Sequence, residues 1–343
     1  MLSLDNQNFI QSVDRENLAK IISQSSQNGL KILSRARKSI LIPKNWPKFG
    51  KVVVSGMGGS GIVGELAKML ISPSFPFLIV KNNKIELSLD KNTLSIIVSF
   101  SGNTKETLSC FKESLKKKAH IFVISSGGEI IKIAKSKRIP YFQINHPGPP
   151  RTALINLLIP MLVLLEKLHL ASLKGLSSSL KKLKELNQYF EPKVPTEKNI
   201  SKHLAYTIFK HLPIITALSQ EKALGWRWAT QFQENSKNFA FTAELPEIFH
   251  NLVEAKFPEL IEGDVFFIIL GSKKHNHITK FAKFLSQRKI CFTTIIGQGK
   301  TCLERIWYLI LLGDWTSYYL AILNNTPPAP TNQISQLKHI NKF

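Results

Sequence analysis

The stretch Val52-Val53-Val54-Ser55-Gly56-Met57-Gly58-Gly59-Ser60-Gly61 decides the fold of this chain, together with a later stretch of the same design, Ile96-Ile97-Val98-Ser99-Phe100-Ser101-Gly102-Asn103-Thr104. In each, an apolar, β-branched run typical of a buried parallel strand ends in a turn rich in Gly and Ser, and an apolar-periodic helix follows. Such a turn aims backbone N–H groups and hydroxyls at one point beside a positive helix terminus. Two such turns from one sheet therefore predict a pocket for a phosphate monoester.

The first turn, Gly56–Gly61, matches the dinucleotide-binding pattern G-x-G-x-x-G, but its surroundings argue against a nucleotide. That pattern requires an acidic residue about 20 residues further on, at the end of the next strand. The next predicted strand, Phe77–Val80, is followed instead by Lys81 and Asn82. A P-loop requires Gly-Lys-Ser/Thr after the turn, and an Ile-Val pair stands there. Neither nucleotide class is favoured.

The second turn carries three hydroxyls, Ser99, Ser101 and Thr104. One interpretation is an ordinary helix N-terminus, with Asn103 as the N-cap and Glu106 completing a capping-box-like pair. A cap alone does not account for three hydroxyls around one turn. We therefore expect these hydroxyls to hold a phosphate as well.

Together the two turns resemble the sugar isomerase (SIS) domain, a doubly wound α/β fold that binds sugar phosphates. In order and spacing, further segments resemble the bifunctional phosphoglucose/phosphomannose isomerases, which carry two SIS domains: Pro147-Gly148-Pro149-Pro150-Arg151, Gln233-Glu234-Asn235-Ser236-Lys237, Leu245-Pro246-Glu247-Ile248-Phe249-His250-Asn251, Gly313-Asp314-Trp315-Thr316-Ser317-Tyr318-Tyr319-Leu320 and Ile334-Ser335-Gln336-Leu337-Lys338. The resemblance covers the chain from about residue 50 to the C-terminus. One departure is Leu252, where the family usually has an acidic residue.

The expected fold class is α/β, with two doubly wound parallel-sheet SIS domains, flanking helices and a C-terminal helix. We divide the chain into an N-terminal helical segment (1–48), a first, phosphate-binding SIS domain (49–170), a helical connector (171–203) and a second SIS domain with the C-terminal helix (204–343). Strands are expected near 51–55, 77–80, 95–99, 120–124 and 140–143, and then near 213–217, 265–270 and 292–295. Long helices are expected near 152–168, 220–236 and 302–324.

The net charge of +23, with an isoelectric point near 9.9, raises the question of nucleic-acid binding. The lysines are spread over predicted helix surfaces, as in Lys116–Lys118, and no zinc finger or RNP-type motif occurs. We therefore expect no nucleic-acid partner. A basic surface would also steer a dianionic sugar phosphate toward the protein.

The sequence predicts a cytoplasmic protein with no membrane span, metal or cofactor. The N-terminus lacks the basic region and apolar core of a signal peptide. The longest apolar stretches, such as 157–165, are too short to span a bilayer. The cysteines form no C-x-x-C pair or Cys/His cluster, which fits a reducing compartment: Cys110, Cys291 and Cys302. His275 and His277 are interpreted as part of a solvated loop.

Interconversion of an aldose and a ketose phosphate moves a proton between C1 and C2 through a cis-enediolate. It requires a base that reaches both carbons, a group that opens the sugar ring, and positive charge near the developing oxyanion. Glu234 is the expected base. It lies on a different helix face from the apolar stripe Leu224, Trp228 and Phe232, near the helix C-terminus, where the dipole disfavours an anion. The alternative is a surface glutamate paired with Lys237, and the family match favours catalysis.

Four further residues complete the expected chemistry. The resemblance implies that His250 shuttles the ring-oxygen proton and reaches the active site of a neighbouring subunit, which implies a homodimer with shared sites. It also assigns ring opening to Lys338, on or beside the expected buried face of the last helix. Thr331 is expected near C1 and C2, and Arg151, whose approach is fixed by two prolines, near the enediolate. The structural alternatives are a capping or core histidine for His250, a snorkelling lysine for Lys338 and a domain-interface ion pair for Arg151.

The sequence therefore predicts an isomerase that interconverts glucose 6-phosphate, and also mannose 6-phosphate, with fructose 6-phosphate. Gly59 and Ser60 are expected to contact the sugar. An amino-sugar phosphate isomerase or deaminase is the enzymatic alternative, although Leu2 stands where the glutamine-dependent kind has its cysteine nucleophile. A non-enzymatic sugar-phosphate sensor would keep the phosphate turns and usually add a DNA-binding domain, for which residues 1–48 are too short.

Overall fold

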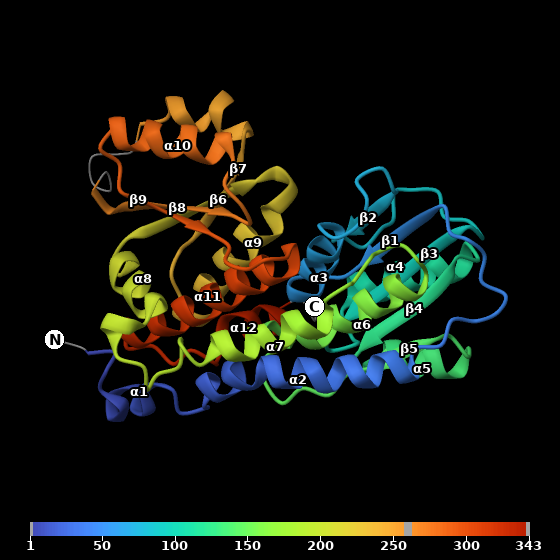
Figure 1. Cartoon of the computed structure of the whole chain (residues 1–343). Helices are drawn as coiled ribbons and strands as arrows, with labels where there is room; N and C mark the ends of the chain where they lie inside the picture. Colours follow the sequence, from blue (N-terminus) through green and yellow to red (C-terminus); the bar gives the residue numbers. More distant parts are fainter. Residues whose placement is uncertain (1–2, 257–262, 341–343) are drawn as a thin grey trace. The chain divides into compact units, whose positions relative to one another are not determined.

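The computed structural model describes residues 3–256 and 263–340 of the chain, except for the side chains of residues 338 and 339. Two compact units are formed, and each contains one parallel sheet (Figure 1). Residues 25–181 make the first-sheet unit, and residues 1–24 together with 182–343 make the second-sheet unit. The helices α2 (Leu18–Ser39) and α7 (Leu176–Asn187) each have residues in both units, so this division differs from the expected one.

The first-sheet unit is built on five parallel strands in the order β2-β1-β3-β4-β5. Their bounds confirm the predicted strands: β1 (Lys51–Ser55), β2 (Phe77–Val80), β3 (Thr93–Ser99), β4 (His120–Ser125) and β5 (Tyr141–Gln143). The central strand β3 is buried at all of its residues, as expected for a parallel strand covered on both faces. The strand order reverses between β1 and β3, which makes the sheet doubly wound.

Four helices follow the strands of this sheet: α3 (Gly59–Lys68), α4 (Lys105–Lys116), α5 (Gly128–Ser136) and, after the 3₁₀ turn η1 (Pro150–Ala153), α6 (Leu154–Lys167). The first three are amphipathic and bury one face. α6 is buried along its whole length from Leu154 to Leu165 and confirms the helix predicted near 152–168.

Among its described residues, the second-sheet unit has four parallel strands in the order β7-β6-β8-β9. Three were predicted, namely β6 (Leu212–Leu218), β8 (Val265–Gly271) and β9 (Phe292–Ile296). The edge strand β7 (Phe241–Leu245) was not predicted. Phe241 and Thr242 are exposed, and only Leu245 is fully buried, so this strand lacks the apolar and buried run that marks β6 and β8.

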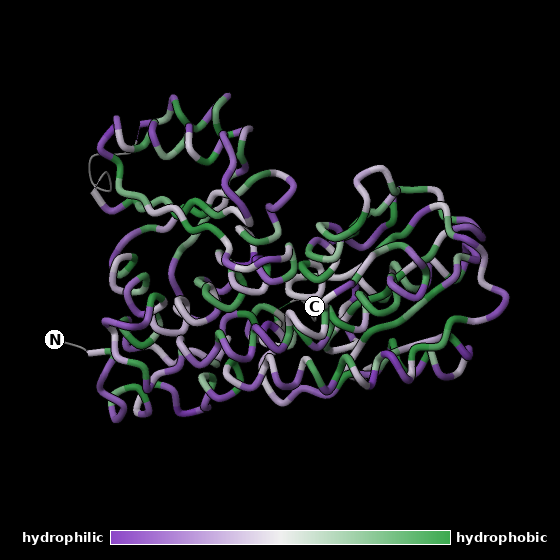
Figure 2. The backbone as a smooth tube through the Cα atoms, in the orientation of Figure 1, coloured by the Kyte–Doolittle hydropathy of each residue, from purple (hydrophilic) through white to green (hydrophobic). Residues whose placement is uncertain are grey.

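The helices of this unit are α1 (Gln7–Val13), α8 (Ile200–Ile208), α9 (Lys222–Gln231), α10 (Asn276–Gln287), α11 (Cys302–Leu323) and α12 (Asn332–Ile340). A π-helix, η4 (Phe232–Ser236), continues α9, so the helix predicted near 220–236 is confirmed with a wider last turn. Short 3₁₀ turns lie between: η2 (Thr196–Lys198), η3 (Ser219–Glu221), η5 (Glu247–His250) and η6 (Leu252–Glu254). α10 alternates between hydrophobic and hydrophilic turns in Figure 2 and packs Ile278, Phe281 and Leu285 on the sheet.

Helix α11 forms the centre of the second-sheet unit. It is long and apolar enough to span a membrane, with a mean hydropathy of 1.3. However, 94% of its apolar stretch is buried inside the protein, as in a core helix. It is the single such helix among the residues that the structure describes. Its buried tryptophans Trp307 and Trp315 are among the largest side chains of the core.

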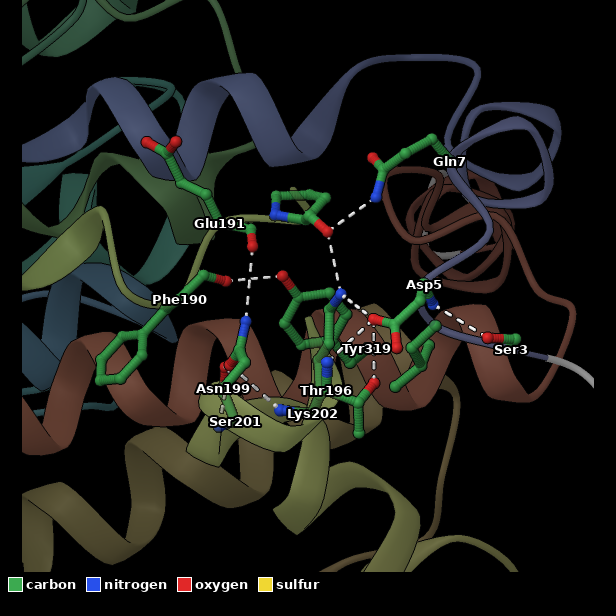
Figure 3. Close-up of polar contacts among 12 residues, drawn as sticks. Ser3, Asp5, Gln7, Phe190, Glu191, Thr196, Asn199, Ser201, Lys202 and Tyr319 are labelled. Carbon is green, nitrogen blue, oxygen red and sulfur yellow. Dashed lines mark hydrogen bonds and ion pairs between the residues drawn. The ribbon is translucent and has the colours of Figure 1, made fainter. Parts of the chain in front are cut away.

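Within the second-sheet unit, a buried lysine links the N-terminal segment to helix α8 (Figure 3). The side chain of Lys202 is fully buried. Its Nζ donates to Asp5 Oδ1 at 2.8 Å and to the carbonyl of Pro192 at 2.8 Å. The ammonium also lies 5.5 Å from the ring centroid of Tyr319. Burial lowers the pKa of Lys202 from its usual value, while Asp5 acts in the opposite direction.

We expect Asp5→Ala to destabilise the protein, because it leaves a buried ammonium without its carboxylate. Breaking a buried ion pair costs about 3–5 kcal/mol, and since the Asp5 side chain is 45% exposed, the lower end is expected. Denaturant unfolding measures the loss. The double variant Asp5→Ala/Lys202→Met should regain most of it, since no charge then remains buried. A single variant as stable as wild type would contradict this interpretation.

The same pair predicts a dependence of that deficit on pH. The folded pKa of Lys202 lies below its unfolded value, so at alkaline pH the unfolded state binds more protons than the folded state. The contribution of Lys202 to the free energy of unfolding therefore rises as the pH increases from the folded pKa of Lys202 to its unfolded pKa, about 10.4. The deficit of Asp5→Ala should accordingly narrow at alkaline pH.

Candidate active site

The two phosphate turns predicted from the sequence lie at the point where the strand order of the first sheet reverses. Residues 56–58 follow β1 and lead into α3, and residues 100–104 follow β3 and lead into α4. β1 and β3 are neighbouring parallel strands, so the turns at their carboxyl ends share one edge of the sheet. Doubly wound sheets bind ligands in the crevice at this reversal.

Three hydroxyls converge in the second turn. The Thr104 Oγ1 lies 3.2 Å from Ser99 Oγ and 3.5 Å from Ser101 Oγ. Ser99 Oγ also accepts the backbone N–H of Gly102 at 3.1 Å, which ties the turn to the end of β3. Thr104 is the N-cap residue of α4 and makes no side-chain capping bond there. Hydroxyls and the positive end of a helix are thus gathered at one place, the arrangement that suits a phosphate.

The prediction that Asn103 caps α4 is wrong. Its Oδ1 instead accepts the backbone N–H of Glu129 at 2.9 Å, in the first turn of α5. The turn is therefore held by α5 as well. Gly102, at φ +70°, presses so closely on Gly127 that a Cβ at Gly102 would lie 1.8 Å from the Gly127 carbonyl oxygen. The phosphate turn has little room for any other residue at this position.

Ser60, Gly59 and Arg151 lie beside this turn. The Ser60 Oγ accepts the backbone N–H of Phe100 at 3.2 Å, so the first turn is bonded to the second. An ideal Cβ on Gly59 would lie 3.8 Å from the Cα of Arg151. Arg151 is 3% exposed and stands in η1, directly before α6. Within the first-sheet unit, the structure thus gathers the predicted sugar contacts, the predicted phosphate ligands and the backbone of Arg151.

His146 belongs to the same region and was not singled out from the sequence. The Thr152 hydroxyl donates to the carbonyl of Pro149 at 2.8 Å, so it accepts from His146 Nε2–H at 2.6 Å. Burial lowers the pKa of His146 to about 4, and the ring is therefore neutral at physiological pH. This pair closes the proline turn that precedes Arg151. A histidine that is followed by a proline-rich turn gives no periodic signal, so only its nearness to Arg151 in the sequence could have indicated it.

The reversal point of the second sheet is occupied by a side chain of the protein itself. Glu221, at the end of η3 after β6, accepts the backbone N–H of Ser272 at 2.9 Å and also bonds the Ser272 hydroxyl, just after β8. Glu221 is 7% exposed. Because a carboxylate already fills this position, a phosphate is disfavoured there, which leaves the first sheet as the candidate phosphate site.

Glu234 stands in the π-helix η4 and lines a cavity of about 750 Å³ in the second-sheet unit. Lys237, Phe239 and Thr331 line the same cavity. Glu234 is half-buried, while the stripe of Leu224, Trp228 and Phe232 is fully buried, as predicted.

Lys237 joins the two segments that carry Glu234 and Thr331. Its Nζ donates to the carbonyl of Glu234 at 2.5 Å and to the carbonyl of Pro330 at 2.8 Å. The residue ends the π-helix in the left-handed conformation, at φ +60°. Cations are favourable at such carbonyl-rich helix ends. The structure therefore brings Glu234 and Thr331 to one cavity through a shared lysine.

The remaining predicted residues of this unit lie differently. His250 ends the 3₁₀ turn η5, is exposed, and is not among the described residues that line the Glu234 cavity. Lys338 belongs to α12, but its side chain lies outside the described residues. The expected buried face of the last helix is not found, because Ile334 and Leu337 are 41% and 59% exposed. Apolar spacing indicated a face of this helix without indicating what covers it.

No group of three or more His, Cys, Asp or Glu side chains with metal-binding geometry occurs in the described part of the chain. His275 Nδ1 accepts the backbone N–H of His277 at 3.2 Å and caps α10. His277 therefore lies in a helix, and its interpretation as part of a solvated loop is wrong. The three cysteines are free thiols, with Cys110 buried and the other two exposed.

Comparison with known proteins identifies related chains. The family described as the bacterial phospho-glucose isomerase C-terminal SIS domain matches residues 197–340. The bifunctional phosphoglucose/phosphomannose isomerase of Caldicellulosiruptor bescii is 31% identical, over 88% of this chain and 92% of that protein. The enzyme of the same name from Aquifex aeolicus is 30% identical, over 87% and 92%. The crystal structure of a hypothetical protein from Thermus thermophilus has a TM-score of 0.74 at 15% identity and covers 97% of this chain and 94% of that one, which supports the fold.

Proposed function

The chain belongs to the bifunctional phosphoglucose/phosphomannose isomerase family, and we propose that it interconverts glucose 6-phosphate and mannose 6-phosphate with fructose 6-phosphate. Within the structure, each unit contributes one feature that supports this proposal. One unit offers a hydroxyl-lined turn at a helix N-terminus for a phosphate. The other offers a half-buried glutamate in a cavity large enough for a hexose, about 750 Å³.

In the proposed mechanism Glu234 removes the proton from C2 of the open-chain aldose and returns it to C1. The negative charge on the enediolate oxygens is stabilised by the Arg151 guanidinium, which cannot be deprotonated at physiological pH. Ser99, Ser101 and Thr104 hold the phosphate, and Gly59 and Ser60 leave room for the sugar. Thr331 contacts the substrate near C2. Rotation about the C2–C3 bond of the enediolate before reprotonation accounts for both aldose epimers.

His250 and Lys338 are proposed to open the sugar ring. The imidazole of His250 is a side chain of the kind that can both accept and return the ring-oxygen proton. We further propose a cytoplasmic location, in keeping with the three free cysteines.

We propose that the protein is a homodimer in which His250 serves the site of the partner. The exposure of His250, away from the cavity of its own Glu234, supports this arrangement. Exposed apolar side chains on α12, at the start of β7 and just before β7 are of the kind that interfaces cover: Phe239, Phe241, Ile334, Leu337 and Ile340.

Subunit complementation tests the shared site. Homodimers of Glu234→Gln and of His250→Ala should each be inactive. A mixed dimer would contain one site with both residues intact and one site with neither. Random exchange of subunits is therefore expected to restore about a quarter of wild-type activity. Absence of recovery after verified exchange would contradict a shared site and leave the isomerase proposal intact.

The function itself is tested by coupled assays of the purified protein on each aldose phosphate, with excess EDTA present. We expect both activities to survive the chelator, because the proposed chemistry uses a carboxylate base and a guanidinium. Loss of activity on EDTA that zinc restores would contradict the mechanism. Activity on neither sugar phosphate would contradict the function.

A further inference from the structure

The helix that carries Glu234 is held on its buried side by polar residues of α11. Asp314 Oδ1 accepts hydrogen bonds from Arg227 Nη2 and from Gln231 Nε2, each at 2.8 Å. The two donors lie one turn apart on α9, and each is 1% exposed. Because both converge on one carboxylate oxygen, they fix the rotation of α9 about its axis.

Ser317, one turn after Asp314 on α11, bonds the π-helix η4. The Ser317 hydroxyl donates to the backbone carbonyl of Asp314 at 2.9 Å. It also accepts a hydrogen bond from Asn235 Nδ2, at 2.9 Å. Ser317 and Asn235 are both fully buried. Asn235 directly follows Glu234, and this bond therefore holds the turn from which the Glu234 side chain projects.

Such support matters most in a π-helix. The wider turn is rare, occurs mostly as single turns inside α-helices and is frequently found at functional sites. It is therefore expected to depend on tertiary bonds, and the next residue supplies another: Asn324 Nδ2, from the C-terminal end of α11, donates to the carbonyl of Ser236 at 2.9 Å. Two consecutive residues after Glu234 are thus bonded to the same helix.

We propose that Ser317 is a positioning residue for the proton transfer, acting through Asn235 on the Glu234 carboxylate. This inference rests on the proposed function, because it takes Glu234 as the base. It also gives a task to the Gly313–Leu320 segment, which the proposed mechanism otherwise leaves unused. Misplacing a catalytic group by about 1 Å can cost about 100-fold in rate.

The neighbouring residue of α11 provides a matched control. Thr316 is also fully buried, but its Oγ1 has no hydrogen-bond partner among the described residues. Thr316→Val removes a hydroxyl at the same depth without removing a bond to the π-helix. Ser317→Ala removes the hydroxyl that Asn235 contacts.

Both variants are assayed with glucose 6-phosphate that carries hydrogen or deuterium at C2. For Ser317→Ala we expect kcat to fall by about tenfold or more while KM stays within about threefold. The primary isotope effect on kcat should be at least as large as in wild type, because proton abstraction is the step that is slowed. Thr316→Val should stay within about twofold of wild type. Asn235→Ala should show the same split, and Ser317→Ala/Asn235→Ala should be no slower than the slower single variant.

Equal losses in Ser317→Ala and Thr316→Val would overturn the inference. A loss that appears in KM with kcat preserved would do the same, as would a rate loss with no isotope effect. If Ser317→Ala does not fold, Asn235→Ala removes the other half of the same bond and decides the question alone. A wild-type protein that isomerises neither sugar phosphate would contradict the proposed function instead, so the two failures are distinguishable.

Discussion

Glu234→Gln is expected to lower kcat by about 10²–10⁴-fold, the usual cost of removing a general base. The amide keeps the size and polarity of the side chain but cannot accept the proton from C2. The phosphate and the sugar hydroxyls keep their contacts, so sugar-phosphate binding should remain nearly unchanged. Steady-state kinetics on both aldose phosphates, with calorimetric binding of the substrate to the variant, measure the two effects separately.

Glu244→Gln is the matched control for this variant. Glu244 lies in the same unit, is 41% exposed in its side chain and makes a long ion pair of 3.6 Å with Lys222. Its replacement removes the same charge from the unit and should leave turnover unchanged, since exposed pairs contribute about 0–1 kcal/mol. Retention of more than about a tenth of wild-type turnover in Glu234→Gln would refute the assignment of the base.

Gly102→Ala is expected to disable phosphate binding. The glycine has φ +70°, and its Cβ would lie 1.8 Å from the Gly127 carbonyl oxygen, so the backbone of the turn must move. Because the Gly102 N–H holds Ser99 Oγ, that movement would separate the three hydroxyls. We expect KM for the sugar phosphates to rise by about tenfold or more, which corresponds to about 1.4 kcal/mol of binding, together with a lower melting temperature.

Gly127→Ala tests whether the effect comes from the contact or merely from a change of glycine. An ideal Cβ on Gly127 meets no atom within 4 Å, although its own carbonyl is the group that Gly102 touches. Its backbone is extended, at φ 171°, which residues other than glycine also adopt. We expect KM close to that of wild type. Comparable losses in the two variants would argue against the specific role of Gly102.

The parts of the fold that could be predicted from the sequence are those with a local signal. Strands such as β1 and β3 are apolar, β-branched runs that end in Gly and Ser. The first and last residues of each strand were predicted to within two residues. The edge strand β7 has no such run, because one side of it faces solvent, and its pairing with β6 depends on contacts distant in sequence.

The candidate site divides in the same way. The convergence of hydroxyls around Thr104 follows from spacing alone, and the structure places Thr104 Oγ1 within 3.5 Å of both serine hydroxyls. The contact of Asn103 with α5 joins segments 26 residues apart, and a local capping rule assigned it to the nearer helix. The π-helix at Glu234 was also outside sequence reasoning, because apolar periodicity there is that of an ordinary α-helix and the support comes from α11.

The central claim is that this chain moves a proton between C1 and C2 of a hexose phosphate through an enediolate. Its most direct test is incubation of fructose 6-phosphate with the metal-free protein in D₂O, followed by NMR of the products. We predict that glucose 6-phosphate and mannose 6-phosphate both form and that both carry solvent deuterium at C2, because the proton on Glu234 exchanges with solvent. Absence of aldose products would contradict the account, whereas aldoses without deuterium at C2 would indicate that Glu234 carries the same proton from C1 to C2 before it exchanges with solvent.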